Sequence, residues 1–228
     1  MKRKSFTILL ILSTLIFSCN KAKRTSEKFV DYSNKNVLDS LIKNTPSSID
    51  TLFLGFRMGM TKIEYKKHLK NLRKEGKNIS TDKTIIVSFL NKRFELGPGN
   101  TFTTEISDNY STGKGEYFIV PYYDNNNKLI QLNVRISDEY ISGTYKPEWF
   151  KKKLRENSKI LSNKNLKRAL INHQIIKNSD FLRQKGNTII YETYLSINYI
   201  DLRTLLIKLV YKETEKELIR KKSNDIKF

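Results

Sequence analysis

The sequence predicts an α+β fold, an antiparallel β-sheet with helices packed on one face, and three observations support this class. Hydrophobic residues make up 38% of the 228 residues, which is enough to bury a core. Several short runs alternate apolar and polar residues, as strands with one buried face do. Two segments carry helix start signals followed by apolar residues.

The best-defined helix is predicted over residues 61–75. Thr61 and Glu64 have the spacing of a capping box, in which each side chain bonds the other residue's free backbone N–H. Apolar side chains follow at i, i+3, i+4 and i+7, and Gly76 supplies a stop. A second helix is predicted from Pro147 to about residue 161, because proline favours the first position of a helix.

Strands are predicted in five alternating or β-rich runs, at 84–90, 101–106, 116–123, 128–137 and 188–200. The Asn-rich turn between the third and fourth runs makes them an antiparallel hairpin, and Pro121 indicates an edge position or a bulge.

Three further segments have weaker patterns. The run 51–56 looks like a short strand, and a short helix is expected near 166–171. Residues 202–211 fit both helical and strand spacing, and their Leu, Ile, Val and Tyr content favours a strand. Residues 212–222 are charged and favour a helix.

The first 19 residues have the pattern of an export signal. Three basic residues precede an uncharged apolar run that is too short to span a membrane. The run ends at Ile16-Phe17-Ser18-Cys19, which resembles the lipobox of bacterial lipoproteins, although Phe17 is bulkier than the usual residue. The resemblance implies that the Cys19 thiol is lipid-modified, that the preceding residues are removed and that the chain is anchored to a membrane.

This interpretation divides the chain into a signal peptide (1–18), a lipid-anchored tether (19–48) and a single α+β domain (49–228). The tether is polar, with one short helical turn expected around 38–42. Cys19 is the only cysteine, so the lipidated chain has no thiol for a disulfide or a metal. The anchor implies the cell envelope, and Asn20 favours the outer membrane because it is not the acidic residue that often marks inner-membrane retention.

Residues 53–74 carry a second resemblance. A strand followed by Gly-Met-Thr-x-x-Glu at the start of a helix is similar to the entry of small outer-membrane assembly lipoproteins and of related inhibitor-like domains. The resemblance bears on fold and does not specify a function.

Patterns that carry catalytic chemistry are missing from the sequence. The two histidines form no His-Glu-x-x-His motif, and His68 falls on an apolar helical stripe, which favours a packing role. We find no nucleophile elbow and no phosphate-binding loop. We therefore predict no catalytic residue, metal or cofactor, while a hydrolase whose carboxylates are dispersed along the chain stays an alternative.

The formal net charge of +20 suggests contact with anions. The predicted contact residues are lysines of the two helices: Lys66, Lys67, Lys70, Lys151 and Lys152. No nucleic-acid-binding motif accompanies the charge, so no nucleic acid is expected. A basic but functionally neutral surface, produced by an AT-rich genome that favours Lys, Asn and Ile, is the competing interpretation.

The functional hypothesis is a non-catalytic envelope lipoprotein that binds a protein partner or an anionic lipid or polysaccharide surface. The alternatives are the hydrolase and an inhibitor or immunity-type lipoprotein.

Overall fold

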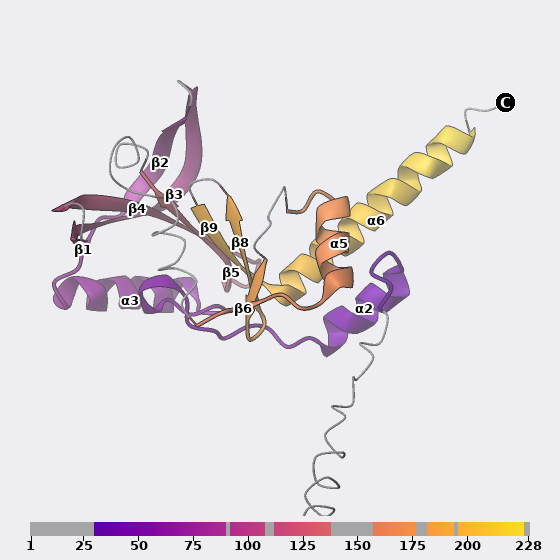
Figure 1. Ribbon diagram of the computed structural model, residues 1–228, viewed down its shortest axis with the longest axis horizontal. Coiled ribbons are helices and arrows are strands. Elements are labelled where there is room, and N and C mark those ends of the chain that lie inside the picture. The colour runs from indigo at the N-terminus through magenta and orange to yellow at the C-terminus, as the bar shows by residue number, and fades with distance from the viewer. Residues whose placement is uncertain are drawn as a thin grey trace, which may run out of the picture. The chain divides into compact units, whose positions relative to one another are not determined.

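The computed structural model describes residues 30–89, 92–107, 112–137, 157–176, 182–193 and 196–225 (Figure 1). Within these residues an antiparallel β-sheet is combined with four α-helices, which confirms the predicted α+β class.

The sheet is ordered β1-β3-β4-β5-β9-β8-β7-β6, and β2 pairs with the first half of the long strand β3. Every pairing between neighbours is antiparallel. The strands are β1 (Asn78–Ile79), β2 (Asp82–Phe89), β3 (Lys92–Ser107), β4 (Thr112–Tyr123), β5 (Leu129–Ile136), β6 (Lys159–Ile160), β7 (Arg183–Lys185), β8 (Thr188–Thr193) and β9 (Ser196–Asp201).

The predicted β4–β5 hairpin is confirmed, and its proline lies where the chain tolerates one. Pro121 pairs with Leu132 of β5 but lies beyond Ile119, where the pairing of β4 with β3 ends. A register shift follows between Tyr122 and Tyr123. Proline lacks a backbone N–H, so a locally unpaired edge beside a bulge is a suitable position.

Helix α3 (Lys62–Lys74) forms where the sequence predicts it. Both halves of its capping box are present: Glu64 N donates to Thr61 Oγ1 at 3.2 Å, and Thr61 N donates to Glu64 Oε2 at 2.7 Å. Gly76 follows the helix with φ of 80°, a left-handed conformation that favours glycine.

One face of α3 packs onto the sheet. Tyr65, Leu69 and Leu72 are buried in the main core cluster together with side chains of β3, β4 and β5. The Tyr65 hydroxyl donates to Asn100 Oδ1 of β3 at 2.9 Å. At the start of the helix, Lys62 N donates to the Asn127 carbonyl in the β4–β5 turn at 3.1 Å. The orientation of α3 on the sheet is therefore fixed along its length.

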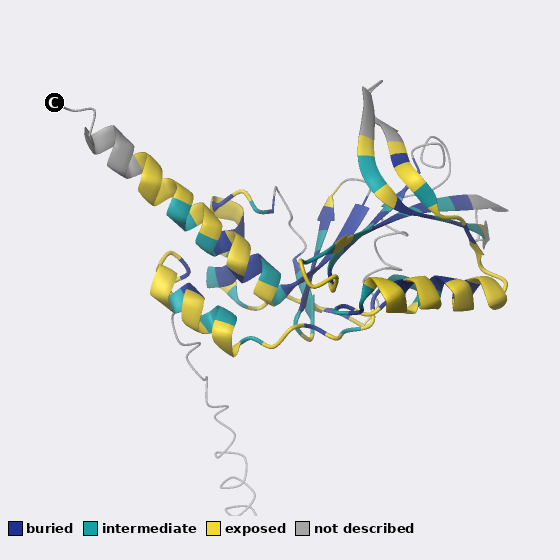
Figure 2. Cartoon of the chain, turned by 180° about the vertical axis from the view of Figure 1, so that it is seen from behind, coloured by how far each residue is buried: buried dark blue, intermediate teal, exposed yellow. Residues whose placement is uncertain are grey.

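The other three helices are α2 (Lys35–Asn44), α5 (Lys164–Asn172) and α6 (Leu202–Asp225). Helices α2 and α5 both contact α6 (Figures 1 and 2). Leu38 of α2 and Leu170 of α5 are fully buried, as is Leu205 of α6. The expected short helix near 166–171 is confirmed as α5.

The prediction of a strand over 202–211 is wrong, because these residues begin the long helix α6. Leu205, Leu206 and Leu209 are buried at helical spacing, so the helical alternative was the correct one. The Asp201 side chain accepts from Thr204 N at 3.0 Å, which satisfies a free N–H at the helix start. The helix continues through the charged segment that the sequence predicts as helical.

The predicted strand at 51–56 is replaced by a tight loop. Phe53–Gly55 is a single 3₁₀ turn, in which Leu54 and Gly55 have φ of 53° and 78°. Thr51 and Arg57 form an isolated bridge across the loop. The loop directs Phe56 into the core, so apolar content here reflects burial of single side chains and not an extended strand.

Three other predictions need correction. The run 188–200 is a hairpin of two strands, β8 and β9, in which Thr193 pairs with Ser196. Helix α2 and its buried Leu38 lie within the predicted tether, so the folded region begins before residue 49. Of the helix predicted over 147–161, residues 147–156 lie outside the described residues, and Lys159–Ile160 is a short strand.

Candidate interaction surface

The outer face of α3 carries three of the predicted contact residues. Lys66, Lys67 and Lys70 are all exposed, on the side of the helix opposite the buried residues (Figure 2). Ile63 lies among them with 80% of its surface exposed. We name these four residues the basic face of α3.

Glu64, an acidic residue beside the basic face in the sequence, belongs to the capping box. Glu64 accepts two hydrogen bonds from Thr61, one from its backbone N–H and one from its hydroxyl. These bonds, the backbone one most of all, hold the pKa of Glu64 below its usual range. Within the described part of the chain, Lys66, Lys67 and Lys70 form no ion pair. Their charges therefore face solvent without compensation.

The remaining predicted site residues lie outside the described residues. These are Cys19 of the predicted lipobox and Lys151 and Lys152 of the second predicted helix. The predicted contact of Lys151 and Lys152 with anions thus stays a prediction. None of the helices that the structure describes is long and apolar enough to cross a membrane.

Both histidines contact other parts of the fold. His68 packs edge-on against Phe56 with ring centroids 4.8 Å apart, and its Nε2 lies 2.8 Å from the Leu54 carbonyl oxygen. Its position on the apolar side of α3 agrees with the predicted packing role. Among the described residues, no group of three His, Cys, Asp or Glu side chains could hold a metal ion.

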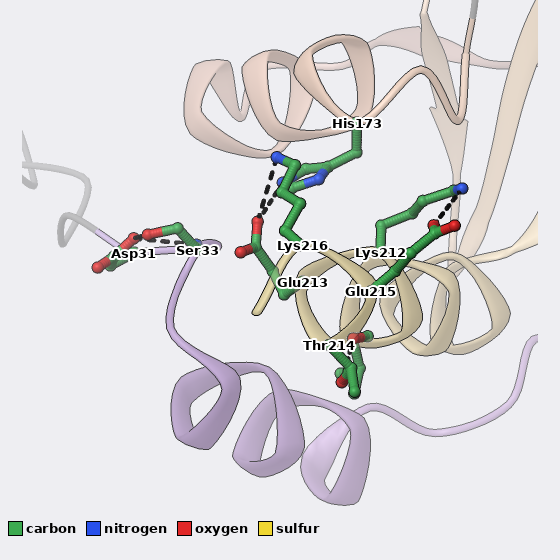
Figure 3. Close-up of polar contacts among 9 residues, drawn as sticks. Asp31, Ser33, His173, Lys212, Glu213, Thr214, Glu215 and Lys216 are labelled. Atoms are coloured by element: carbon green, nitrogen blue, oxygen red, sulfur yellow. Dashed lines mark hydrogen bonds and ion pairs between the residues drawn. The ribbon is translucent and has the colours of Figure 1, made fainter. Parts of the chain in front are cut away.

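His173 forms a buried contact that the sequence does not reveal. It follows α5, and its Nε2 lies 2.6 Å from Glu213 Oε1 of α6, while Lys216 reaches the same oxygen at 3.7 Å (Figure 3). Burial lowers the pKa of His173 more than the Glu213 carboxylate raises it, and Lys216 and Lys212 lower it further. The neutral imidazole therefore joins α5 to α6.

This arrangement predicts a stability that depends on pH. Because the pKa of His173 in the folded chain lies below its unfolded value of about 6.5, folding is favoured by the neutral ring. The contribution is present above that pH and is lost as the pH falls toward the folded value. We expect wild type to lose more unfolding free energy on acidification than His173→Gln, measured by denaturant titration across this range. Equal losses would contradict the assignment.

A second polar cluster joins the N-terminal segment to the sheet. Ser48 N donates to Asp201 Oδ1 at 2.8 Å, and Ser48 Oγ donates to Asp50 Oδ2 at 2.6 Å. Thr188 Oγ1 donates to the same Asp50 oxygen at 3.0 Å. We name Ser48, Asp50, Thr188 and Asp201 the Asp50–Asp201 cluster. Sequence reasoning did not single it out, because its members are up to 153 residues apart.

The Asp50–Asp201 cluster bears on the hydrolase alternative, since it brings two dispersed carboxylates to one place. Backbone N–H groups of Ser48, Asn187 and Thr204, and neighbouring hydroxyl groups, donate to the two carboxylates. Carboxylates that accept hydrogen bonds from several segments hold those segments together, and Asp201 is buried. The arrangement supports a structural role for both residues.

Comparison with known proteins yields no relative. The chain matches no protein-family model, and no curated protein or solved structure is significantly similar to it.

Proposed function

We propose that this chain is a non-catalytic, lipid-anchored protein of the cell envelope, and that the basic face of α3 binds phosphate-bearing lipid headgroups. The observation that carries the proposal is the outward array of Lys66, Lys67 and Lys70 around the exposed Ile63. The lipobox at Cys19 supplies the expected anchor. Both features would attach the chain to the same membrane surface.

The energetics favour a combination of two signals. A lysine close to an anionic membrane contributes about 1 kcal/mol, so the three lysines together contribute about 3 kcal/mol. Such binding alone is weak and reversible, whereas a diacyl or triacyl anchor holds a protein stably. The basic face would therefore orient an anchored domain on the membrane.

The proposal predicts vesicle binding that depends on these lysines. A chain beginning at residue 20, which keeps the whole compact unit 31–228, should sediment with vesicles containing anionic lipid and not with purely zwitterionic vesicles. Substituting Lys66, Lys67 and Lys70 by Gln should reduce the partition coefficient at least tenfold, because about 3 kcal/mol of attraction is removed. Added salt should weaken wild-type binding in the same direction.

A matched control separates position from net charge. Lys43, Lys83 and Lys164 are exposed lysines on α2, β2 and α5, and their substitution by Gln changes the charge equally. The control variant should keep most of the binding. Equal losses in the two triple variants would show that total charge matters and the basic face does not. Binding unaffected by salt would also overturn the proposal.

A further inference from the structure

Helix α6 is apolar on two opposite sides. Its inner side buries Leu205, Leu206 and Leu209. On the outer side, Tyr211, Leu218 and Ile219 expose 75%, 57% and 61% of their surface, and Ile207 is also exposed (Figure 2). A helix side that faces solvent normally carries polar residues, so this second apolar face indicates a partner.

The outer side of α6 borders an open groove of about 770 Å³. Ile175, which follows α5, closes one side of it. Seven residues of α6 line the groove, and they mix apolar and polar side chains: Lys208, Tyr211, Lys212, Thr214, Glu215, Leu218 and Ile219. We name these residues, together with the exposed Ile207, the outer face of α6.

The charges of the outer face are arranged so that one copy of the face complements a second copy. Glu215 lies between the apolar residues Tyr211 and Leu218, and Lys208 and Lys212 precede it by two turns and by about one turn. In the single chain Lys212 Nζ bonds Glu215 Oε2 at 2.7 Å, and Lys208 Nζ reaches Gln131 Oε1 at 3.3 Å. Burial lowers the pKa of Lys208.

Orientation decides whether two such faces attract. If two α6 helices pair antiparallel about an axis near residue 212, Glu215 of each copy faces Lys208 and Lys212 of the other. The same axis places Ile207 of each copy opposite Leu218 of the other. Parallel pairing would instead set Glu215 against Glu215 and each lysine against itself, which is repulsive.

We propose that the outer face of α6 is the interface of a two-fold symmetric homodimer, in which the antiparallel α6 of a second copy occupies the groove. Self-complementary charge is the property of a surface that meets its own copy, as a two-fold interface requires. The interface leaves the basic face of α3 free, so it is independent of the proposed membrane contact.

Cysteine cross-linking in the full chain tests the orientation. Two differently tagged copies are co-expressed, one carrying Ile207→Cys and the other Leu218→Cys, and are oxidised in the cell membrane fraction. We expect a disulfide between the copies, because antiparallel helices place these positions together, whereas parallel helices separate them by about 16 Å. Copies with Lys66→Cys on α3, and copies with no added cysteine, report non-specific cross-linking.

Charge exchange tests the complementarity. One copy carries Glu215→Lys, and the other carries Lys208→Glu with Lys212→Glu. Each variant alone should lose at least tenfold in self-association, since every cross-helix pair becomes repulsive. Mixing the two variants should restore association, because all the pairs become attractive again. Recovery in the mixture also shows that both variants are folded.

The outcomes are decisive in either direction. A cross-link specific to the 207/218 combination together with recovery in the mixture supports the dimer. A monomer by sedimentation equilibrium at tens of micromolar wild-type protein overturns it. Equal association of wild type, the single variants and the mixture overturns it as well, since the outer face would then have no role.

Discussion

Replacing Phe56 by alanine should lower the free energy of unfolding by about 3–5 kcal/mol, the largest effect expected of any single truncation in this chain. Phe56 is fully buried in the main core cluster. Its ring stacks on Tyr65 at a centroid distance of 4.6 Å and meets His68 edge-on. Both partners belong to α3, so the truncation leaves a cavity where the helix contacts the core.

The change is large against the total stability of about 5–15 kcal/mol that is typical of folded proteins. We expect the melting temperature to fall by on the order of 10 °C. Phe53 is a matched control, because it is a phenylalanine of the same loop that is only partly buried. Phe53→Ala should cost clearly less, and Phe56→Leu should fall between Phe56→Ala and wild type. Denaturant unfolding that ranks Phe53→Ala as the more damaging change would refute this account of the core.

Replacing Asp201 by alanine should cost about 2–4 kcal/mol, the second largest effect. One Asp201 oxygen accepts from Ser48 N, and the other accepts from the backbone N–H and hydroxyl of Thr204 at 3.0 and 3.2 Å. Alanine would leave the Ser48 N–H buried without its acceptor and would remove the cap of α6. The segment at Ser48 and the start of α6 would therefore both lose their contact with residue 201.

The Asn variant separates these two contributions. Asparagine keeps one acceptor oxygen and is a good helix cap, so Asp201→Asn should retain part of the lost stability. Asp31→Ala is the external control, because Asp31 also accepts from a backbone N–H, that of Ser33, but is exposed. We expect thermal unfolding to rank Asp201→Ala as least stable, then Asp201→Asn, with Asp31→Ala near wild type. An unfolding curve of Asp201→Ala identical to that of wild type would mean that the shared cluster contributes nothing.

Local signals in the sequence were sufficient where a single element satisfies its own backbone groups. The Thr61–Glu64 capping box and Gly76 predicted α3 almost to the residue, because these interactions form within one helical turn. The β4–β5 hairpin was likewise predicted from alternation and a short turn. The three described lysines of the basic face followed directly from the helical spacing on α3.

Prediction failed where distant contacts decide the structure. The segment 202–211 fits both periods, and the choice of helix follows from the Asp201 cap and from burial against other elements. The helical turn expected around 38–42 is confirmed within α2, but the burial of Leu38 follows from tertiary contacts that the polar sequence of this segment does not indicate. Neither the His173–Glu213 contact nor the Asp50–Asp201 cluster has a local signature, because their members meet only in the folded chain.

The central claim of the proposed function is that Cys19 carries a lipid, and fatty-acid labelling of the full chain with membrane fractionation tests it most directly. We expect wild type to incorporate labelled palmitate, to begin at Cys19 by mass spectrometry and to fractionate with membranes. Cys19→Ser should incorporate no label and should keep residues 1–18, because processing requires the modified thiol. Label retained in the serine variant, or a wild-type chain that begins at Met1 without added acyl mass, would contradict the account.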